Sequence, residues 1–495
     1  MSLLKKSIAL CLFLLSANLF SQSFTSIWNT NNTETGSSLN NEVTIPTNPA
    51  FTTYNYNVDW GDGSSDTGIT GNITHTYTTP GTYTIEISGT FPSIYFNDDN
   101  ASDKLKIIEI LAWGTIQWQT MENAFFGCAN MNFDLIDSPD LTQVTSLKNM
   151  FRGGTSFNGI VNNWDVSTIT DISGVFADCS IFNRPVDSWT TNSVTDMSET
   201  FKNTSFNQPL DNWNTSSVTN MKDMLYACVN FNQNINNWNV SQVTDMSGMF
   251  VACRRFNQPL NNWNVSQVTD MNLMFFRTND FNQDISTWQV GNVTNMFRAF
   301  HESAISYPMN DWDVSAVTNM QQMFADTPNF NQPLNNWDVS SVTDMSQMFR
   351  SARVFNQPLN DWNVSAVTNM SQMFAASTSP TSSAFNQPLN NWDVSSSTNY
   401  AYMFQDAINF NQPLSNWDTS NVGTMLFMFR NAQSFNQDIS SWDFSGLTST
   451  GSMSNFMQQK SASNYDATYY DNLLIKWASD ESLGGLPNNL SLTKI

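Results

Sequence analysis

The sequence predicts an α/β repeat solenoid, built from short parallel strands plus short helices, preceded by a small all-β sandwich. Three observations predict it: a repeat of about 25 residues, a strand-like and a helix-like segment inside each repeat, and an N-terminal region with alternating residues and glycine turns. We expect five parts: 1–22 as a signal peptide, 23–39 as a linker, 40–97 as the sandwich, 98–460 as a solenoid of about fourteen repeats and 461–495 as a C-terminal cap.

Tryptophan marks the repeat, because twelve tryptophans follow one another at intervals of 24 or 25 residues, with one interval of 30. The longer interval contains the insertion 377–383, whose composition is typical of a surface loop. One repeat cannot bury its own Trp, Val, Met and Phe, whereas stacked neighbours can. We therefore expect the tryptophan row to be the structural core of the array: Trp164, Trp189, Trp213, Trp238, Trp263, Trp288, Trp312, Trp337, Trp362, Trp392, Trp417 and Trp442.

The segment 330–349 (FNQPLNNWDVSSVTDMSQMF) is a clear copy of the repeat. Its Trp-Asp-Val part alternates apolar and polar residues, which predicts a short strand. Asp344 then stands where a helix N-cap is expected, because its side chain can accept a free backbone N–H. The buried-type residues that follow have the spacing of one helix face, which predicts a short helix. They are Met345, Met348, Phe349 and Ala352.

The N-terminal region differs in composition from the repeats. Alternating runs at 54–60 and 82–87 are separated by Gly-Asp-Gly and Pro-Gly, which predicts a small antiparallel β domain. At the other end, the sequence Asn472 to Trp477 predicts a short capping helix over the last repeat.

The repeats and the N-terminal region each resemble a known family. The recurring Phe-Asn-Gln…Trp-Asp-Val…Asp-Met-Ser-x-Met-Phe phrase over roughly 105–460 resembles the BspA-like leucine-rich repeat surface proteins of bacteria, in their Trp/Met/Phe-rich variant. Asp59-Trp60-Gly61-Asp62-Gly63, with His75-Thr-Tyr77, resembles a PKD-type β-sandwich. The first resemblance implies a leucine-rich-repeat-like solenoid on a secreted or surface protein associated with adhesion. The second implies a spacer or a weak glycan-binding module.

Composition and charge indicate an exported protein that does not bind nucleic acid. The chain carries 42 acidic against 19 basic residues, a net charge of -23, which repels polyanions such as nucleic acid. Lys5 and Lys6, followed by the apolar run 8–15, are typical of a signal peptide, and we expect no transmembrane segment. The predicted location is therefore extracellular, either secreted or on the cell surface.

Candidate chemistry is sparse, and we predict no enzyme, no catalytic residue and no cofactor. The two histidines, His75 and His301, lie in no catalytic motif, and His75 is expected to form structural hydrogen bonds. Aspartate and asparagine exchange freely in the position after Trp and in the cap position, so we expect hydrogen bonding there, with weak calcium binding as the alternative.

Four cysteines remain after the predicted signal peptide. Cys128, Cys179, Cys228 and Cys253 occupy a small-residue position of the repeat, so we expect buried thiols. Cys228 and Cys253 lie in adjacent repeats, and a disulfide between them is the alternative.

Three functions fit these features. The first is a non-catalytic adhesin or interaction scaffold that binds a surface protein or a glycan. The second is a carbohydrate-binding accessory protein, and the third is a structural element of a surface coat that self-associates. Near-identical repeats favour a periodic ligand, or a site where the period breaks: 300–308, 377–383 or the junction with the β domain.

Overall fold

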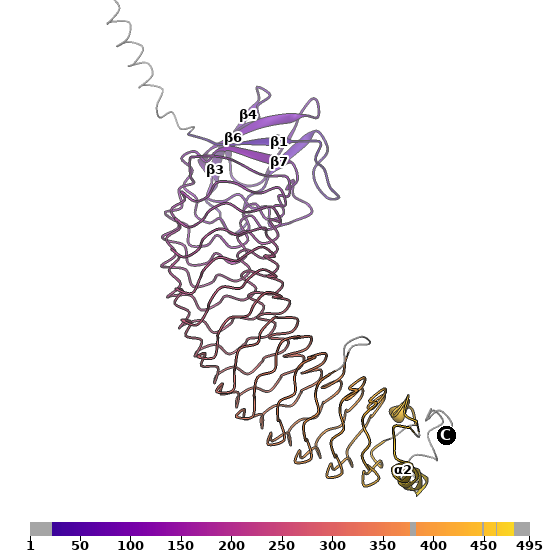
Figure 1. The fold of residues 1–495 in the computed structure, drawn as a ribbon. Coiled ribbons are helices and arrows are strands. Elements are labelled where there is room, and N and C mark those ends of the chain that lie inside the picture. Colours follow the sequence, from indigo (N-terminus) through magenta and orange to yellow (C-terminus); the bar gives the residue numbers. More distant parts are fainter. Residues whose placement is uncertain (1–21, 377–382, 448–449, 462, 480–495) are drawn as a thin grey trace, which may run out of the picture. The chain divides into compact units, whose positions relative to one another are not determined.

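The computed structural model describes residues 22–376, 383–447, 450–461 and 463–479, in two compact units, Met1–Trp213 and Asn214–Ile495. Figure 1 shows antiparallel strands near the start of the first unit and repeated turns through the rest of both. The predicted signal peptide, apart from Gln22, lies outside the described residues, as do 377–382 of the insertion and 480–495 of the predicted cap.

Seven strands form two antiparallel sheets in the N-terminal region. They are β1 (Phe24–Asn29), β2 (Glu42–Ile45), β3 (Asn55–Asp59), β4 (Ser65–Ile69), β5 (Ile73–Thr76), β6 (Thr82–Thr90) and β7 (Ile107–Ala112). The larger sheet has the order β4-β3-β6-β1-β7, and β2 pairs with β5. The register places Phe24 opposite Ile87 and Asn55 opposite Thr90. The region is thus a small antiparallel β domain.

This sheet extends beyond the expected range 40–97 on both sides. The segment 23–39, expected as a linker, contains β1, which pairs with both β6 and β7. In β1, Phe24 and Trp28 are fully buried, which explains why this segment joins the sheet. Strand β7 also connects the sheet to the first repeat, because Glu109 forms a parallel bridge with Asn132.

The β3–β4 turn carries the Asp-Trp-Gly-Asp-Gly motif. Trp60 is fully buried, its Nε1 donates to Asp66 at 2.8 Å, and its ring stacks on His75 at 4.7 Å between centroids. Gly61 has φ +72° and lies against the backbone of Thr84, where a Cβ atom would come within 2.3 Å of a carbonyl oxygen. Only glycine fits this close approach.

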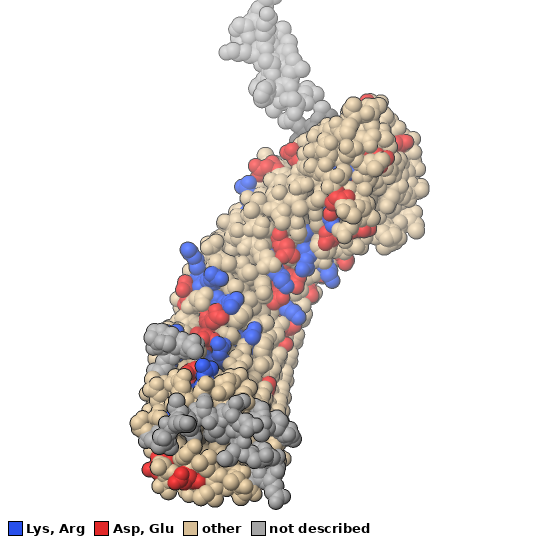
Figure 2. All heavy atoms as spheres, turned by 90° about the vertical axis from the view of Figure 1, so that its right-hand side faces the viewer, with Lys and Arg blue, Asp and Glu red and all other residues tan. Residues whose placement is uncertain are grey.

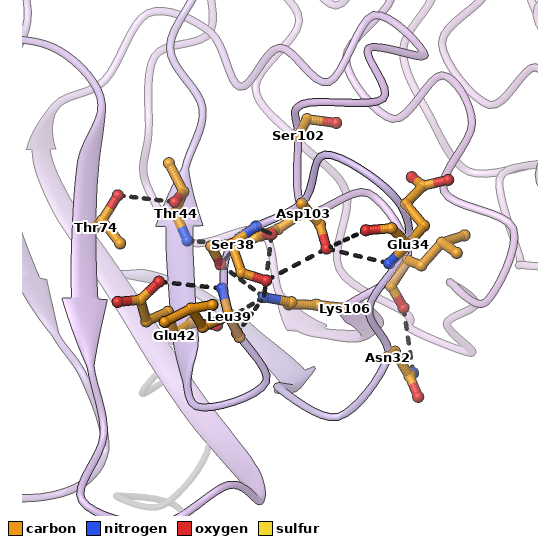
Figure 3. A network of polar contacts seen from close by, with 12 residues as sticks. Asn32, Glu34, Ser38, Leu39, Glu42, Thr44, Thr74, Ser102, Asp103 and Lys106 are labelled. Atoms are coloured by element: carbon orange, nitrogen blue, oxygen red, sulfur yellow. Dashed lines mark hydrogen bonds and ion pairs between the residues drawn. The ribbon is translucent and has the colours of Figure 1, made fainter.

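A buried ion pair ties the 34–44 loop region to β7 (Figure 3). The Lys106 ammonium lies 3.1 Å from Asp103 Oδ1, and both side chains are fully buried. Lys106 also donates to the carbonyls of Leu39 and Glu42, and Asp103 accepts the Thr44 N–H at 2.7 Å. These hydrogen bonds satisfy both charges, which is what burial of an ion pair requires.

Successive repeats are joined by single-residue parallel bridges rather than by strands. Within the second unit the bridges link the Asp/Asn position of neighbouring repeats, as in Asp245 with Asp270 and Asp344 with Asn369. The predicted strand at Trp-Asp-Val is absent from residues 141–447, apart from the undescribed insertion. Instead, the aspartate after Trp closes a tight turn: Asp338 Oδ1 accepts the Ser340 N–H at 3.0 Å.

The predicted short helix is also wrong, because the same described repeats form consecutive turns there. In 345–352, the N–H groups of Met345, Gln347, Phe349 and Ser351 donate to carbonyls of the following repeat. Those of Met348, Arg350 and Ala352 donate three residues back. Gln347 and Ser351 have φ of 60° and 56°, in the left-handed region that interrupts a right-handed helix. Asp344 therefore caps a turn, accepting the Ser346 N–H, and not a helix.

Rows of aromatic rings fill the core of the repeats. In the second unit, Trp337 stacks on Trp362 with ring centroids 6.4 Å apart and an interplanar angle of 2°. Phe349 stacks on Phe355 at 4.0 Å and on its equivalents in the two neighbouring repeats, Phe324 and Phe374, at 5.9 Å. Rings at the Phe349 position thus contact their equivalents on both sides, so the hydrophobic stabilisation is shared between neighbours.

The last described repeat is followed by a 3₁₀ turn η1 (Thr450–Met453) and a helix α2 (Ala467–Ser479). Asp466 accepts the Thr468 N–H at 2.8 Å and caps α2. Trp477 of α2 is fully buried and lies 5.9 Å from the Phe444 ring and 6.3 Å from the Phe456 ring. The helix thus covers aromatic rings of the final repeat. Within the described ranges, no helix has the length and hydropathy needed to cross a membrane.

Candidate functional site

The consecutive turns give each repeat an outward face. We call the ten residues that begin at the first Met of Met-x-x-Met-Phe the turn segment, as in 345–354. Its first, fourth, fifth and eighth residues point into the core: Met345, Met348, Phe349 and Ala352 are at most 2% exposed. The third, sixth, seventh, ninth and tenth residues form what we call the turn face; the ninth and tenth, here Arg353 and Val354, are exposed, and the others are half-buried or buried.

The turn face is the variable part of an otherwise repetitive chain. The core positions keep Met and Phe in most repeats, whereas the third position changes in size, charge and aromatic character. From 271 to 434 it is occupied by Leu273, Arg298, Gln322, Gln347, Gln372, Tyr402 and Phe427. A constant scaffold that presents variable side chains on a regular backbone is a common arrangement for recognition.

Basic side chains gather in the turn segments. Of the thirteen Lys and Arg residues between 141 and 460, all except Arg184 lie there. Figure 2 shows blue and red side chains along one face, with large areas that carry neither. Because the whole chain is strongly acidic, this concentration of positive charge distinguishes the turn segments from the rest of the repeats.

Arginines and phenylalanines form a cluster on the turn face of the second unit. The Arg298 guanidinium lies 5.6 Å from the Phe276 ring centroid and 5.0 Å from that of Phe297. The Arg277 guanidinium lies 5.0 Å from the Phe276 centroid, and its Nε is 3.1 Å from Glu302. These distances are within the range of cation–π attraction.

His301 lies between two carboxylates of this cluster. Its Nε2 is 3.4 Å from Asp326 and 3.5 Å from Glu302, and its ring meets Phe276 edge-on at 5.1 Å. Burial would raise the pKa of Asp326, but the hydrogen bond from His301 and the charge of Arg350, 3.5 Å away, outweigh burial and hold this pKa below its usual value. Asp326 is therefore ionised at neutral pH and organises the charges around it.

Two further clusters occupy turn segments elsewhere. In the second unit, Tyr402 stacks on Phe427 at 5.1 Å, and the Arg430 guanidinium lies 5.3 Å from the Phe427 centroid. In the first unit, Arg152 pairs with Glu199 at 2.6 Å. Lys202 lies 2.9 Å from the same carboxylate. Each cluster combines charged or aromatic side chains from different repeats, which is chemistry suited to binding.

The predicted tryptophan row lies elsewhere, inside the core. All twelve side chains are at most 3% exposed, so their ring faces are covered. The indole N–H groups reach the preceding repeat: Trp337 Nε1 donates to the Met309 carbonyl at 2.8 Å, and Trp362 Nε1 to Leu334 at 3.0 Å. The structure therefore places these residues in the packing between repeats and not on a binding surface.

The structure also shows the surroundings of His75 and of the Asp/Asn rows, which the sequence offered as candidates for chemistry. His75 Nε2 is 2.9 Å from Asp62, whose hydrogen bonds from Ser64 and His75 lower its pKa to about 2. The aspartate and asparagine rows close turns with the N–H two residues on, and no group of three potential metal ligands forms in the part of the chain that the structure describes.

The cysteines from Cys128 onward are buried thiols. Cys253 donates to the Leu225 carbonyl at 2.9 Å, and burial raises its pKa well above the usual value. No disulfide joins the described cysteines, so the alternative of a bond between Cys228 and Cys253 is wrong.

Of the three expected breaks in periodicity, two can be placed. Residues 300–308 contain His301 and Glu302 of the arginine–phenylalanine cluster, and 377–382 lie outside the described residues. At the junction with the β domain there is a hollow of about 530 Å³ lined by Thr44, Pro46, Asn72, Tyr95 and Asp99, among others.

The turn face itself was missed by sequence reasoning. The signal that could have revealed it is the distribution of Lys and Arg within the repeat period, together with the variability of the third, sixth and seventh positions.

Comparison with known proteins identifies the repeats. A family model described as "Mycoplasma protein of unknown function, DUF285" matches residues 119–226, 201–308, 296–383 and 380–470. No curated protein and no solved structure matches the chain.

Proposed function

The chain belongs to the DUF285 family, and from that premise we propose that it is an exported, non-catalytic interaction scaffold that binds its partner through the turn face. One observation carries the proposal: the core of the repeats is nearly constant, while the turn face varies and its segments hold almost all basic residues of the array. Charged and aromatic side chains that gather on one face of neighbouring repeats supply the kinds of contact that protein interfaces use.

The proposed architecture is a leucine-rich-repeat-like solenoid behind a PKD-like domain. The parallel bridges and the ring stacking between repeats support stacked coils in each unit. The buried Trp60 and the glycine turn of the Asp-Trp-Gly-Asp-Gly motif support the PKD-like interpretation. The resemblance of the repeats to BspA-like surface proteins supports a location on the cell surface or in the medium.

Adhesion is the form of binding that we propose first. To test it, beads that carry the purified chain are passed over surfaces coated with fibronectin, collagen, mucin or the chain itself. We expect retention on at least one surface. If no surface retains the beads, the adhesin function is contradicted; retention only by the chain itself would instead indicate a coat protein.

Variants locate the binding surface. Three turn-face pairs are changed, one for each cluster: R277Q with R298Q, Y402S with F427S, and R152Q with K202Q. The matched control changes exposed apolar residues outside the turn segments, Y307S with I475S, which are 38% and 68% exposed. We expect at least one turn-face pair to reduce retention about tenfold or more, as loss of interface hot spots does, while the control binds as before. Equal binding by all variants would exclude the turn face.

Export has its own test. When the chain is produced in a bacterium with its first 22 residues, we expect the protein in the medium or surface fraction to lack Lys5 and Lys6, as intact mass spectrometry would show. An uncleaved cytosolic product would contradict export.

A further inference from the structure

Charge is divided sharply between two parts of the same five repeats. Between 246 and 354, the turn segments contain six arginines and three carboxylates. The remaining residues of this range contain six aspartates and no basic residue. The six arginines, which we call the arginine strip, are Arg254, Arg255, Arg277, Arg298, Arg350 and Arg353.

Much of the positive charge in the arginine strip is available to a ligand. Arg254, Arg255 and Arg353 are exposed, and among the residues that the structure describes no carboxylate pairs with them. Arg298 Nε donates to the amide oxygen of Gln322, so that bond leaves its charge uncompensated. Only Arg277 and Arg350 pair with carboxylates, Glu302 and Asp326.

Aromatic rings lie among these arginines. Phe276 and Phe297 are half-buried, and both rings lie within 6 Å of the Arg298 guanidinium. A planar guanidinium binds carboxylate or sulfate groups through paired hydrogen bonds. A neighbouring ring face can pack against the C–H face of a sugar. This combination suits a carbohydrate that carries acidic groups.

The form of the ligand follows from the geometry and from the remaining charge. Neighbouring repeats linked by parallel bridges are about 4.7–4.9 Å apart, so five repeats extend over roughly 20 Å. The net charge of -23 would repel a bulky acidic protein, whose surface would also face the aspartate rows. A narrow linear polyanion can lie along the strip. At physiological salt, its repulsion by aspartates more than about 8 Å away is largely screened.

We infer that the arginine strip binds an extended acidic polysaccharide, with the arginines on its carboxylate or sulfate groups and Phe276 and Phe297 against its sugar rings. This inference rests on the proposed function, since it names the ligand class of the turn face. It differs from that proposal in requiring negative charge on the ligand.

The test compares polymers that differ in charge and in backbone. Binding of the full chain to heparin, polygalacturonate, neutral dextran and polyglutamate is measured by biolayer interferometry at low and at physiological salt. We expect binding to heparin or polygalacturonate that weakens as salt rises, and at least tenfold weaker binding to dextran and polyglutamate. The salt dependence follows from release of counterions from a polyanion.

A matched pair of variants assigns the site. The strip variant R254Q/R255Q/R353Q removes three unpaired charges, whereas K148Q/K222Q/K476Q removes the same charge from outside the strip. We expect the strip variant to lose about tenfold or more in affinity for the acidic polysaccharide, and the control to change less than about twofold. Because all substituted side chains are solvent-exposed or partly exposed, both variants should unfold at the same temperature as the parent chain.

Several outcomes would overturn the inference. They are no binding to either acidic polysaccharide, equal losses in both variants, and preference for polyglutamate, which would indicate an acidic protein partner. If the chain binds no acidic polysaccharide but is retained on a coated surface through the turn face, only the proposed ligand class is contradicted. If the chain binds in neither experiment, the proposed function is contradicted as well.

Discussion

Single residues in this protein carry unusual backbone conformations at regular intervals. The third residue of the turn segment has positive φ whether it is Leu273, Tyr402 or Phe427, although Gly174 and Gly248 occupy it in two repeats. The left-handed region costs a non-glycine residue about 1–2 kcal/mol. The hydrogen bonds between repeats, repeated at every level, are the interactions that hold these residues there.

Replacing one such residue by glycine should therefore stabilise the chain. Gln372 has φ 57°, and we expect Gln372→Gly to raise the free energy of unfolding by about 0.5–1 kcal/mol. The neighbouring Ser371 does not have positive φ, so Ser371→Gly should lower it by a similar amount. Urea unfolding followed by tryptophan fluorescence measures both, and a loss of stability in both variants would contradict the strain argument.

The elements of the fold are held together by buried groups whose partners come from elsewhere in the chain. In the repeats, indoles such as that of Trp337 connect two repeats by ring stacking and by an N–H hydrogen bond. In the β domain, the Lys106–Asp103 pair lies just before β7 and forms hydrogen bonds with Ser38 and Leu39 in the loop before β2. Both arrangements make the stability of an element depend on its neighbour.

For the repeats, we expect Trp337→Ala to cost about 3–5 kcal/mol, the usual range for emptying an aromatic site in a core. Trp337→Phe should cost less, about 1–3 kcal/mol, because the ring remains while the Met309 carbonyl loses its donor. Thermal unfolding of the two variants would give the order. A Phe variant as unstable as the Ala variant would show that the hydrogen bond dominates the stacking.

For the β domain, Lys106→Met should cost about 3–5 kcal/mol, because it leaves the Asp103 carboxylate buried without its cation. Lys104→Met is the comparison: its carboxylate partners Asp98 and Glu34 are 50% and 25% exposed, so water can hydrate both and we expect a smaller cost of about 1–2 kcal/mol. Chemical unfolding monitored by near-UV circular dichroism compares them. Equal costs would mean that burial of the carboxylate is unimportant.

At the scale of the whole molecule, buried lysine and buried tyrosine should make stability depend on alkaline pH in opposite directions. Burial lowers the pKa of Lys460, in the second unit, from 10.5 to about 8. Between these values the unfolded chain binds a proton that the folded chain does not, so stability should rise with pH from about 8 to 10.5. Lys460 donates to the Gln433 and Phe435 carbonyls, which fixes its buried position.

Buried tyrosines should lower stability above pH 10, because burial raises the pKa of Tyr54 in the first unit and of Tyr400 and Tyr465 in the second. Burial raises the pKa of Tyr54 from 10.0 to about 12, so above pH 10 the unfolded chain releases a proton that the folded chain retains. Hydrogen exchange measured by mass spectrometry at pH 8, 9, 10 and 11 would resolve the units separately. We expect protection of the second unit, corrected for the intrinsic rate, to increase from pH 8 to 10 and to lose that increase in Lys460→Met, and protection of both units to fall between pH 10 and 11. Unchanged protection would contradict the effect of Lys460.

The repeat period, the core rows and the antiparallel β region could all be predicted from the order of amino acids alone. Trp337, Met345 and Phe349 could be assigned to the interior because their spacing places them on one side of any compact repeat, and the structure buries them. The same spacing could not decide between a helix and consecutive turns, since both bury the first, fourth, fifth and eighth residues. That choice depends on which carbonyl oxygen accepts each backbone N–H.

Hydrogen bonds between repeats, which are distant in sequence, select the turns over the helix. The Gln347 N–H donates to Ser371, 24 residues away, and no local pattern specifies such a partner. The same bonds turn Gln347 and Arg350 outward and bring Arg277, Arg298 and His301 of neighbouring repeats into one cluster. Side-chain periodicity therefore determined what is buried, whereas hydrogen bonds between repeats decided the backbone path and the face that we propose for binding.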